Sequence, residues 1–515
     1  MSNRNYLKCA LTLATLLGAA APATFAQDVA RGLVYHDSNG DGKRGNGEEG
    51  IAGVGVSNGE DVVLTGSDGA YELPVESDSI IFVIKPSNWR TAMDEKKQLP
   101  RYYYSHKPEG SPVSKYPGVP PTGNLPASVD FPLYPQEESD TFKVILFGDP
   151  QPRNVEEVNY IAHDIVEELI GFDAAFGVTL GDIVFNDLDV FPVLNGVIGR
   201  IGTPWYNVIG NHDINMDTDS DSESDETFEH IYGPAYYSLN YGDVHFIVLD
   251  DVVWNGDGYT GGIGERQLAF VRNDLKHVDK DRLVVVMMHI PLMSVGDKHE
   301  LLHALEGYSN TFSVSAHWHR QGTFFVENQN EELDDHHHLV HGTVSGSWWG
   351  GLKDEFGIPH AFMSDGTPNG YSIATFKGNQ YSLKYKAARR PADFQMSIFA
   401  PEVVTKTDAA DHEVIVNVFM GSSQSKVEMK LGEDGEWAAM KHTEREDPYF
   451  QALKAREYYL PPAAGRKLPG ASKSTHVWTA NLPEKPDVGT HIIHVRTTDM
   501  FGQVFEDERI IRVEK

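Results

Sequence analysis

The sequence has almost no cysteine: among 515 residues, Cys9 alone is of this type, and it lies near the N-terminus. Basic residues precede an apolar run over 9–21, and small residues follow it, a pattern typical of a secretory signal with cleavage before Gln27. We predict a signal peptide over residues 1–26 and an exported protein that is periplasmic or extracellular. A mature chain without cysteine has no disulfides, so its stability must come from large cores or from bound metal.

Positive charge is also scarce. Lys and Arg number 43 against 75 Asp and Glu, which leaves a formal net charge of −32. Such a field repels nucleic-acid backbones and anionic membranes, so we predict no nucleic-acid partner. It also opposes anionic substrates, so a phosphate site here needs local positive charge from metal ions or a few placed cations.

Long hydrophobic runs are missing. The run over 9–21 is shorter than the ~20 apolar residues that a span needs, and no other segment replaces it. We therefore predict no membrane span, with a membrane anchor as the alternative to the signal peptide. Hydrophobic residues at 40% and aromatic residues at 10% are typical of a globular protein, and the length suits about three domains.

Changes of pattern divide the chain into three parts. Residues 27–135 contain many Gly and Pro and short β-branched runs such as 80–84, which predict a β domain. Residues 136–391 alternate apolar strands with amphipathic helices, which predicts α/β layering. After residue 392 the alternation stops, and strands such as 491–495 predict a β-sandwich over 392–515. In the central part, helical spacing runs from Val158 to Leu169, and further helices are expected near 264–278 and 298–306.

Five apolar strands of the central part end in residue types that bind metals. Loops beyond strand ends converge on one crevice in α/β proteins, so these side chains are expected to meet. A single histidine after a strand is more often structural, but five such ends in order are not explained that way. The residues are Asp149, Gln151, Asp182, Asn211, His212, His289, His317 and His319.

In order and spacing, five strings resemble the motif set of the calcineurin-like metallophosphoesterases. They are Gly148-Asp149-Pro150-Gln151, Gly181-Asp182, Gly210-Asn211-His212-Asp213, Met288-His289 and Ala316-His317-Trp318-His319. The resemblance implies a four-layer αββα sandwich, flanked here by the two all-β domains. It also implies two divalent ions bridged by one aspartate.

The resemblance further implies a role for each residue. One ion would be held by Asp149, Gln151, Asp182 and His319, and the other by Asp182, Asn211, His289 and His317. His212 would be the general acid, with Asp213 behind it to keep the imidazole charged and oriented. Family members often have histidine where this chain has Gln151; an amide oxygen is a harder donor, which favours Mn or Fe, with Zn as an alternative.

Hydrolysis of phosphate esters is the expected reaction. Paired ions bind phosphoryl oxygens and lower the pKa of a bridging water, so that hydroxide can attack. We lean towards phosphomonoesters; the alternatives are a phosphodiesterase or a nucleoside-diphosphate-linked pyrophosphatase. The substrate would be a phosphorylated small molecule, glycan or protein. In a different class, the chain could be an inactive binding or adhesion protein on a phosphoesterase scaffold. The sequence does not indicate an oligomeric state.

A second motif has the spacing of a calcium loop. Asp37, Asn39 and Asp41 stand at positions 1, 3 and 5 and Glu48 at position 12. The preceding residues predict a strand, so the segment does not suit a helix-loop-helix hand. We expect structural calcium, with an unoccupied Asn/Gly turn as the alternative.

Three further residues are candidates for substrate contact. Arg320 follows His319 directly and could pair with a phosphate oxygen or with an acidic neighbour. His338 and His341 belong to a histidine cluster that is expected near the mouth of the crevice. Clustered histidines are also often solvent-facing or satisfied by the backbone, so that reading stays open.

Overall fold

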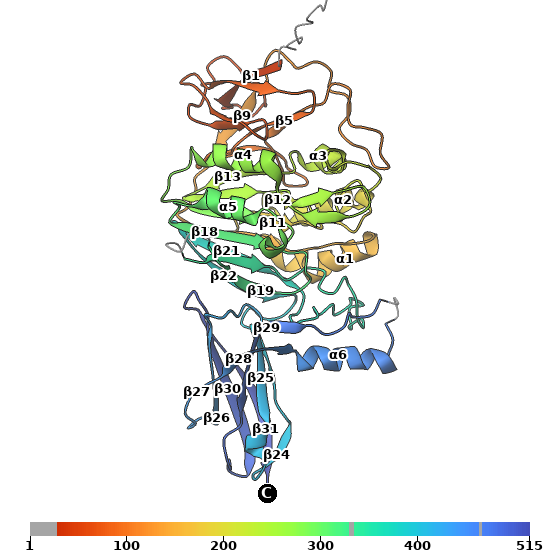
Figure 1. Cartoon of the computed structure of the whole chain (residues 1–515), viewed down its shortest axis with the longest axis vertical. Helices are drawn as coiled ribbons and strands as arrows, with labels where there is room; N and C mark the ends of the chain where they lie inside the picture. Colours follow the sequence, from red (N-terminus) through yellow and green to blue (C-terminus); the bar gives the residue numbers. More distant parts are fainter. Residues whose placement is uncertain (1–27, 329–333, 463–465) are drawn as a thin grey trace, which may run out of the picture.

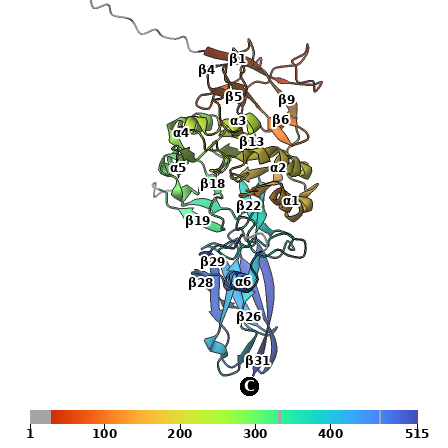
Figure 2. The same cartoon turned by 90° about the vertical axis from the view of Figure 1, so that its right-hand side faces the viewer.

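The computed structural model describes residues 28–328, 334–462 and 466–515. Its N-terminal β part, central α/β part and C-terminal β part follow one another along the long axis (Figures 1 and 2). The predicted signal peptide, residues 1–26, lies outside the described residues. Within the described ranges, no helix is long and apolar enough to cross a membrane.

The N-terminal part is built from two sheets, with strand orders β4-β1-β9-β6-β7 and β3-β2-β5-β8. Val34, Phe82 and Leu133 are fully buried in its core. The strands are β1 (Asp28–His36), β2 (Gly55–Ser57), β3 (Val62–Leu64), β4 (Ala70–Val75), β5 (Ser79–Val83), β6 (Trp89–Asp94), β7 (Leu99–Arg101), β8 (Tyr103–His106) and β9 (Phe131–Pro135).

The first sheet of the central part has the order β12-β11-β10-β21-β22, with β10, β11 and β12 parallel. Its strands are β10 (Thr141–Phe147), β11 (Phe176–Leu180), β12 (Trp205–Val208), β21 (Gly370–Lys377) and β22 (Gln380–Ala387). Helices α1 (Val155–Asp164) and α2 (Phe191–Ile198) share a core with residues of this sheet such as Ile145 and Phe147.

The second central sheet has the order β13-β14-β17-β18-β20-β19, parallel from β14 to β20. Its strands are β13 (Tyr237–Tyr241), β14 (Val244–Val248), β17 (Leu283–Met287), β18 (Asn310–Ser315), β19 (Gly322–Val326) and β20 (His336–Val340). The remaining elements of this half are α3 (Glu226–Tyr232), α4 (Gly264–Leu275), α5 (Lys298–Leu305) and the β15 (Val252–Trp254)–β16 (Tyr259–Gly261) pair.

Aromatic side chains join the two central sheets. The ring of Phe246 on β14 lies 5.1 Å from that of Phe176 on β11 and 5.4 Å from that of Phe376 on β21, measured between centroids. Large apolar rings of this kind bury much surface where two sheets pack face to face. The ends of the parallel strands of both sheets are thereby brought to one region.

Two expected helices, near 264–278 and 298–306, correspond to α4 and α5. The helix expected from Val158 to Leu169 is interrupted. Helix α1 ends at Asp164, and Ile165, at φ −124° and ψ −56°, leaves the helical region before a 3-10 turn over Val166–Leu169. Both segments still bury their apolar residues, because the turn keeps Val166 and Leu169 in the same core.

The C-terminal part consists of two sheets, with orders β23-β25-β29-β28 and β24-β31-β30-β26-β27. Its strands are β23 (Met396–Phe399), β24 (Val403–Thr405), β25 (Glu413–Val418), β26 (Lys426–Leu431), β27 (Ala438–Ala439), β28 (Lys441–Glu446), β29 (Lys473–Asn481), β30 (Gly489–Thr498) and β31 (Val504–Glu514). A helix that the sequence reading did not anticipate, α6 (Pro448–Tyr459), follows β28. Asp447 caps its N-terminus, because the Asp447 side chain accepts a hydrogen bond from the Phe450 N–H, and proline stands at the first helical position.

Candidate metal centre

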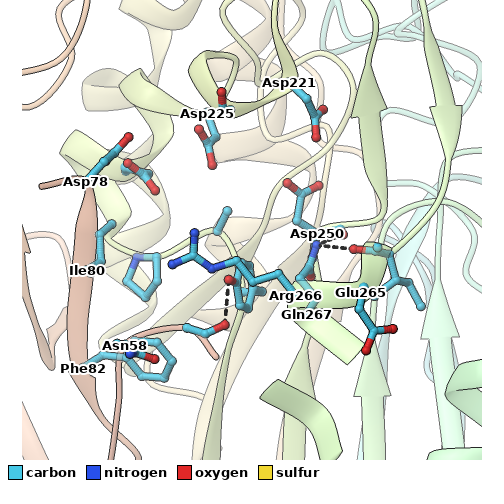
Figure 3. A pocket seen from close by; sticks show the side chains of 18 of the residues that line it. Asn58, Asp78, Ile80, Phe82, Asp221, Asp225, Asp250, Glu265, Arg266 and Gln267 are labelled. Carbon is cyan, nitrogen blue, oxygen red and sulfur yellow. Dashed lines mark hydrogen bonds between the residues drawn. The ribbon is translucent and has the colours of Figure 1, made fainter. Parts of the chain in front are cut away.

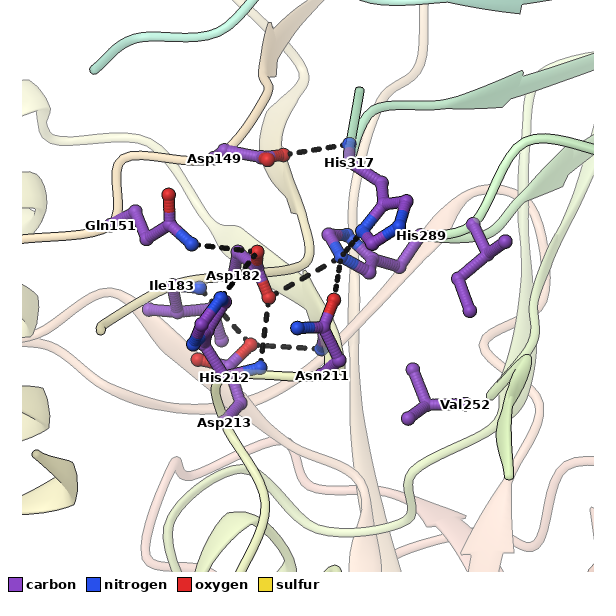
Figure 4. Close-up of polar contacts among 12 residues, drawn as sticks. Asp149, Gln151, Asp182, Ile183, Asn211, His212, Asp213, Val252, His289 and His317 are labelled. Atoms are coloured by element: carbon purple, nitrogen blue, oxygen red, sulfur yellow. Dashed lines mark hydrogen bonds and ion pairs between the residues drawn. The ribbon is translucent and has the colours of Figure 1, made fainter. Parts of the chain in front are cut away.

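The predicted metal ligands lie just beyond the C-terminal ends of five parallel strands. Asp149 follows β10, Asp182 follows β11 and Asn211 follows β12 in the first sheet, while His289 follows β17 and His317 follows β18 in the second. Because the two sheets pack together, the five ends point to one place (Figure 4). The chain therefore brings these side chains together from segments that are up to 168 residues apart.

Two clusters of potential ligands share one carboxylate. Asp149, Asp182 and His319 form the first, and Asp182, His289 and His317 form the second; within each, the ligand atoms lie within 4.8 Å of one another. His319 Nε2 is 3.1 Å from Asp149 Oδ2, and His289 Nε2 is 3.3 Å from Asp182 Oδ1. The shared position of Asp182 is the arrangement that a bridging ligand needs.

The two predicted amide ligands border the same clusters. Gln151 Nε2 donates to Asp182 Oδ2 at 2.8 Å, and Asn211 Oδ1 lies 3.1 Å from His289 Nε2. The Gln151 Oε1 atom is buried without a hydrogen-bond partner. All seven predicted ligands are therefore neighbours, with one amide adjoining each half of the site.

The donor set fits divalent cations. Asp149 and Asp182 are 0% and 2% exposed, and Asp149 Oδ2 is buried without a hydrogen-bond partner. Burying carboxylates side by side is costly unless positive charge compensates them. Carboxylate oxygens, amide oxygens and imidazole nitrogens together suit Mn, Fe or Zn. The residues thus fit a pair of metal ions.

Backbone strain is concentrated at these ligands. Asp149, Gln151, Asp182, His317 and His319 all have left-handed φ, between 34° and 64°. Non-glycine residues seldom adopt this region, and such strain gathers at functional sites where the surroundings impose it. The strand-end loops hold five side chains at angles that an unstrained turn would not give.

Two glycines of the motifs are required because other residues of the site approach their Cα atoms closely. A Cβ at Gly210 would lie 2.0 Å from the Asp182 backbone nitrogen, and one at Gly181 would lie 2.3 Å from His289 Nδ1. Either contact is far shorter than van der Waals distance, so a side chain would push the ligand away. The glycines before Asp182 and Asn211 therefore belong to the architecture of the site.

Other backbone groups orient the imidazoles. His289 Nδ1 faces the Leu180 carbonyl at 2.9 Å, and His319 Nδ1 faces the Gly346 carbonyl at 2.6 Å, which leaves Nε2 of each ring for the centre. Asp251, which the sequence reading missed, accepts hydrogen bonds from the His289 and Ile290 N–H groups at 3.1 and 3.0 Å. It fixes the loop that carries His289.

Electrostatics of the site follow from the shared carboxylate. Burial alone would raise the pKa of Asp182, but the neighbouring imidazoles, His289 first, hold it below its usual value. Burial opposes the charge on His289, yet Asp182 raises its pKa to about 10. His317, desolvated and beside His289, has its pKa lowered to about 4. The Asp182 carboxylate is therefore ionised at neutral pH.

His212 lies at the edge of the centre, but its partner differs from the one expected. Its Nε2 is 4.0 Å from Asp182 Oδ2, its Nδ1 contacts Asn186 Oδ1, and its ring stacks on Phe185 at 4.5 Å. Asp213 instead accepts hydrogen bonds from the N–H groups of three residues, Ile183, Val184 and Gly210. The expectation that Asp213 orients the imidazole is wrong, because its carboxylate binds these backbone N–H groups instead. The side chain that contacts the His212 ring is that of Asn186.

Asn186 could have been considered from the sequence, since it stands four residues after Asp182 in the same loop. Its backbone is also tied to the histidine, because the Asn186 N–H donates to the His212 carbonyl at 3.1 Å. Burial lowers the pKa of His212, with the Asp182 carboxylate opposing this shift.

The predicted substrate contacts of His338 and His341 are wrong, because both side chains are fully buried. His338 contacts the hydroxyls of Ser313 and Ser315 at 2.7 and 3.0 Å and accepts from the Leu292 N–H at 3.2 Å. His341 packs beside the Tyr385 ring, and its Nδ1 contacts a backbone carbonyl. His338 lies on β20, between β18 and the edge strand β19, and His341 directly follows β20; both imidazoles are held in the interior.

Arg320 is half-buried, with its guanidinium 4.6 Å from the centre of the Trp318 ring. Among the described residues it forms no ion pair with a carboxylate. Its contact with substrate stays a prediction.

The calcium-type loop is folded by its own side chains. Asp37 accepts from the Gly40 and Gly42 N–H groups at 2.8 Å, and Glu48 accepts from the Gly45 N–H at 2.7 Å. Asn39 and Asp41 each accept from the N–H two residues further on, as in Asx turns. These bonds suit the turn reading, and calcium binding stays a prediction.

A third acidic cluster already has a cation. Asp78, Glu226 and Glu229 could hold a metal by spacing, but Lys107 Nζ lies 2.7, 2.7 and 2.9 Å from their carboxylates. The cluster borders a pocket of about 350 Å³ between the N-terminal and central parts, which Asp225 and Asp250 also line (Figure 3). Lys107 takes the place that an ion would need.

Paired clusters that share a buried carboxylate, with an adjacent imidazole, form a candidate dinuclear metal centre. Two family descriptions match the chain: N terminal of Calcineurin-like phosphoesterase over residues 38–116, and C terminal of Calcineurin-like phosphoesterase over residues 338–505. Both matched descriptions are of calcineurin-like phosphoesterases, the family that the sequence motifs resemble. These matches cover most of the flanking parts, and the ligand geometry defines the centre between them.

No curated protein matches the chain significantly. Among solved structures, purple acid phosphatase PPD1 from yellow lupin (Lupinus luteus) is 14% identical with a TM-score of 0.34; the match covers 70% of this chain and just under two thirds, 66%, of that one. A superoxide reductase from Ignicoccus hospitalis is 16% identical with a TM-score of 0.14, over 23% of this chain and 80% of that one. CopC from Methylosinus trichosporium OB3b is 13% identical with a TM-score of 0.14, over 23% and 93%. These likenesses are too slight to carry an argument about function.

Proposed function

We propose that the protein is an exported two-metal phosphoesterase that acts on phosphomonoesters, with a four-layer αββα arrangement in its central part. The observation that carries the proposal is the sharing of Asp182 by two ligand clusters, one with Asp149 and His319 and the other with His289 and His317. Paired sites of this kind suit the in-line displacement of an ester oxygen from phosphorus. When bound, the ions would neutralise phosphoryl oxygens and activate a water molecule for attack.

His212 is the proposed proton donor to the departing alkoxide. Its Nδ1 contacts the Asn186 side-chain oxygen, which directs Nε2 towards the centre, 4.0 Å from Asp182 Oδ2. Stacking on Phe185 holds the plane of the ring. A phosphate anion bound beside the imidazole favours its protonated form, which offsets the effect of burial on its pKa.

The metals are proposed to be Mn or Fe, with Zn as the alternative. Gln151 supplies an amide to the half of the site that holds Asp149 and His319, and amide oxygen is a harder donor than imidazole. Elemental analysis of protein purified without chelators tests this assignment. A preparation that holds zinc alone and is fully active would contradict it.

The decisive assay compares 4-nitrophenyl phosphate with bis(4-nitrophenyl) phosphate in the presence of added Mn. Faster turnover of the monoester is expected, and faster turnover of the diester would move the assignment to a phosphodiesterase. No turnover of either substrate by protein that contains two ions per chain would favour the inactive binding protein on a phosphoesterase scaffold. Hydrolysis of a nucleoside diphosphate conjugate would favour the pyrophosphatase alternative.

Export is proposed from the N-terminal segment alone. Expression of the full chain in a bacterial host, followed by N-terminal sequencing of the protein from the periplasm or medium, is expected to begin at Gln27. Intact protein in the membrane fraction would favour the anchor instead.

A further inference from the structure

An arginine from the C-terminal part reaches the edge of the metal centre. The Arg466 guanidinium lies 5.8 Å from the centre of the Phe185 ring and 5.6 Å from that of Trp348. Phe185 stacks on His212, and the Trp348 ring stacks on His319 at 4.0 Å. Arg466 is therefore one aromatic ring away from both the proposed proton donor and a proposed metal ligand.

Backbone hydrogen bonds at Arg466 and just after it fix its position. Its carbonyl accepts from the Gly351 N–H in the central part at 3.1 Å. Two residues later the Leu468 N–H donates to Glu457 on α6 at 2.9 Å, and the Leu468 side chain is buried. The described stretch over 466–472, which leads into β29, thus places the arginine at the boundary between the two parts.

The guanidinium is half-buried and, within the described ranges, forms no ion pair with a carboxylate. Its neighbour Arg153 differs, because it is paired with Glu157. Burial first and then the positive charge of Arg153 lower the pKa of Arg466, and the Glu157 carboxylate opposes this shift without forming an ion pair with Arg466. In a chain with a net charge of −32, a half-buried arginine without a carboxylate partner is an unused binding group for an anion.

We propose that Arg466 binds an anionic group carried by the leaving group, so that the preferred substrates have a carboxylate or second phosphate beside the scissile phosphate. Because His212 is the proposed proton donor, the leaving group departs on its side of the centre. The Phe185 ring contacts both this imidazole and the Arg466 guanidinium. Planar guanidinium groups bind carboxylate and phosphate through paired hydrogen bonds, and stacking on rings preorganises them. The inference rests on the proposed phosphoesterase function and adds a substrate class to it.

The test compares two chromogenic esters that differ by one anionic group: 4-nitrophenyl phosphate and 3-carboxy-4-nitrophenyl phosphate. The wild-type protein is expected to have the lower KM for the carboxylated ester. Arg466→Gln should raise that KM at least about tenfold, equivalent to about 1.4 kcal/mol, with kcat little changed. The same variant should leave both constants for 4-nitrophenyl phosphate within about twofold, an energy of about 0.4 kcal/mol.

Arg496→Gln is the matched control. Arg496 also lies over a tryptophan ring, Trp437 at 4.4 Å, and pairs with Glu428, but it belongs to β30 and contacts none of the groups at the centre. It should not change the ratio of the two KM values. Arg466→Lys retains the charge without the planar fork and should give an intermediate KM.

A readout without turnover separates binding from folding. The free product 3-carboxy-4-nitrophenol should inhibit the wild type competitively and inhibit Arg466→Gln at least about tenfold more weakly, again about 1.4 kcal/mol. Equal losses on both esters, or unchanged inhibition, would overturn the role of Arg466 while leaving the phosphoesterase assignment intact. Absence of turnover of either ester by the metal-loaded wild type would overturn both.

Discussion

Acid should destabilise the protein through histidines that are buried in the neutral state. His336, His337 and His338 are consecutive on β20, and all three are less than 10% exposed. Burial lowers the pKa of His336 to about 4 and that of His337 to about 3, and it holds His338 well below its usual value. The unfolded chain takes up these protons near pH 6.5, where the folded chain does not.

The sign follows from that difference. A histidine whose pKa is depressed by folding keeps its full contribution to stability above pH 6.5 and loses it as the pH falls from 6.5 towards the folded value. At pH 5.5, one unit below the unfolded pKa, each such imidazole costs about 1.4 kcal/mol of unfolding free energy. Three of them amount to roughly 4 kcal/mol, a large part of the 5–15 kcal/mol that stabilises a typical domain.

His337→Phe isolates one contribution. The His337 ring lies between Phe312, 4.9 Å away, and Phe325, 5.5 Å away, so a phenyl ring suits the site. Its Nδ1 is 2.6 Å from the Tyr381 hydroxyl, a bond that the variant loses. We expect the decrease in unfolding free energy between pH 7.5 and 5.5, measured by urea titration, to be about 1.4 kcal/mol smaller in the variant.

Tyr381→Phe is the control, because it removes the same hydrogen bond and keeps the imidazole. It should lower stability at both pH values and leave the pH dependence as in the wild type. If His337→Phe shows the full wild-type decrease, then His337 is not a neutral imidazole in the folded protein, and the reasoning is refuted.

Three other perturbations test the site and its surroundings. Asp182→Asn should remove both ions together, because its carboxylate belongs to both clusters; elemental analysis that finds one ion retained would contradict the bridging role. His212→Ala should retain the metal content and slow esters with poor leaving groups more than 4-nitrophenyl phosphate, and equal slowing in steady-state assays would argue against proton donation. Lys107→Met should lower the free energy of unfolding in urea by about 3–5 kcal/mol, because it leaves Glu226 buried without its cation. Arg31→Met removes an exposed pair and should lower it by about 1 kcal/mol or less. Similar losses in the two variants would show that the Lys107 network adds nothing through burial.

The meeting of the proposed ligands at one place could be predicted because it depends on local pattern. Each of Asp149, Asp182 and His289 follows a short apolar run, and parallel strand ends converge for reasons of topology. The pairing of side chains across loops could not be predicted in the same way. Asp213 and Asn186 are both polar residues near His212, and only the path of the loop decides which one meets the ring.

The histidine cluster was misplaced for a related reason. Three consecutive histidines are typical of a polar surface, yet His336 and His338 face hydroxyl groups of the neighbouring strand β18, including Ser313. The register of β20 against β18 places these polar side chains beside hydrogen-bond partners in the interior, and a strand register cannot be read from one sequence. Arg466 was missed because it lies outside the predicted strands, in the described stretch before β29, and only the folded structure places it beside Phe185 and Trp348.

The left-handed backbone at five ligands bears on when the metals arrive. At about 1 kcal/mol for each residue, these conformations cost about 5 kcal/mol, comparable to the whole stability of a small domain. Assembled sheets can impose such angles on the loops between them, so we expect the ligand loops to adopt this conformation before a cation binds. We therefore expect the metals to bind after the sheets have assembled, unlike in small zinc modules that fold only around their ion.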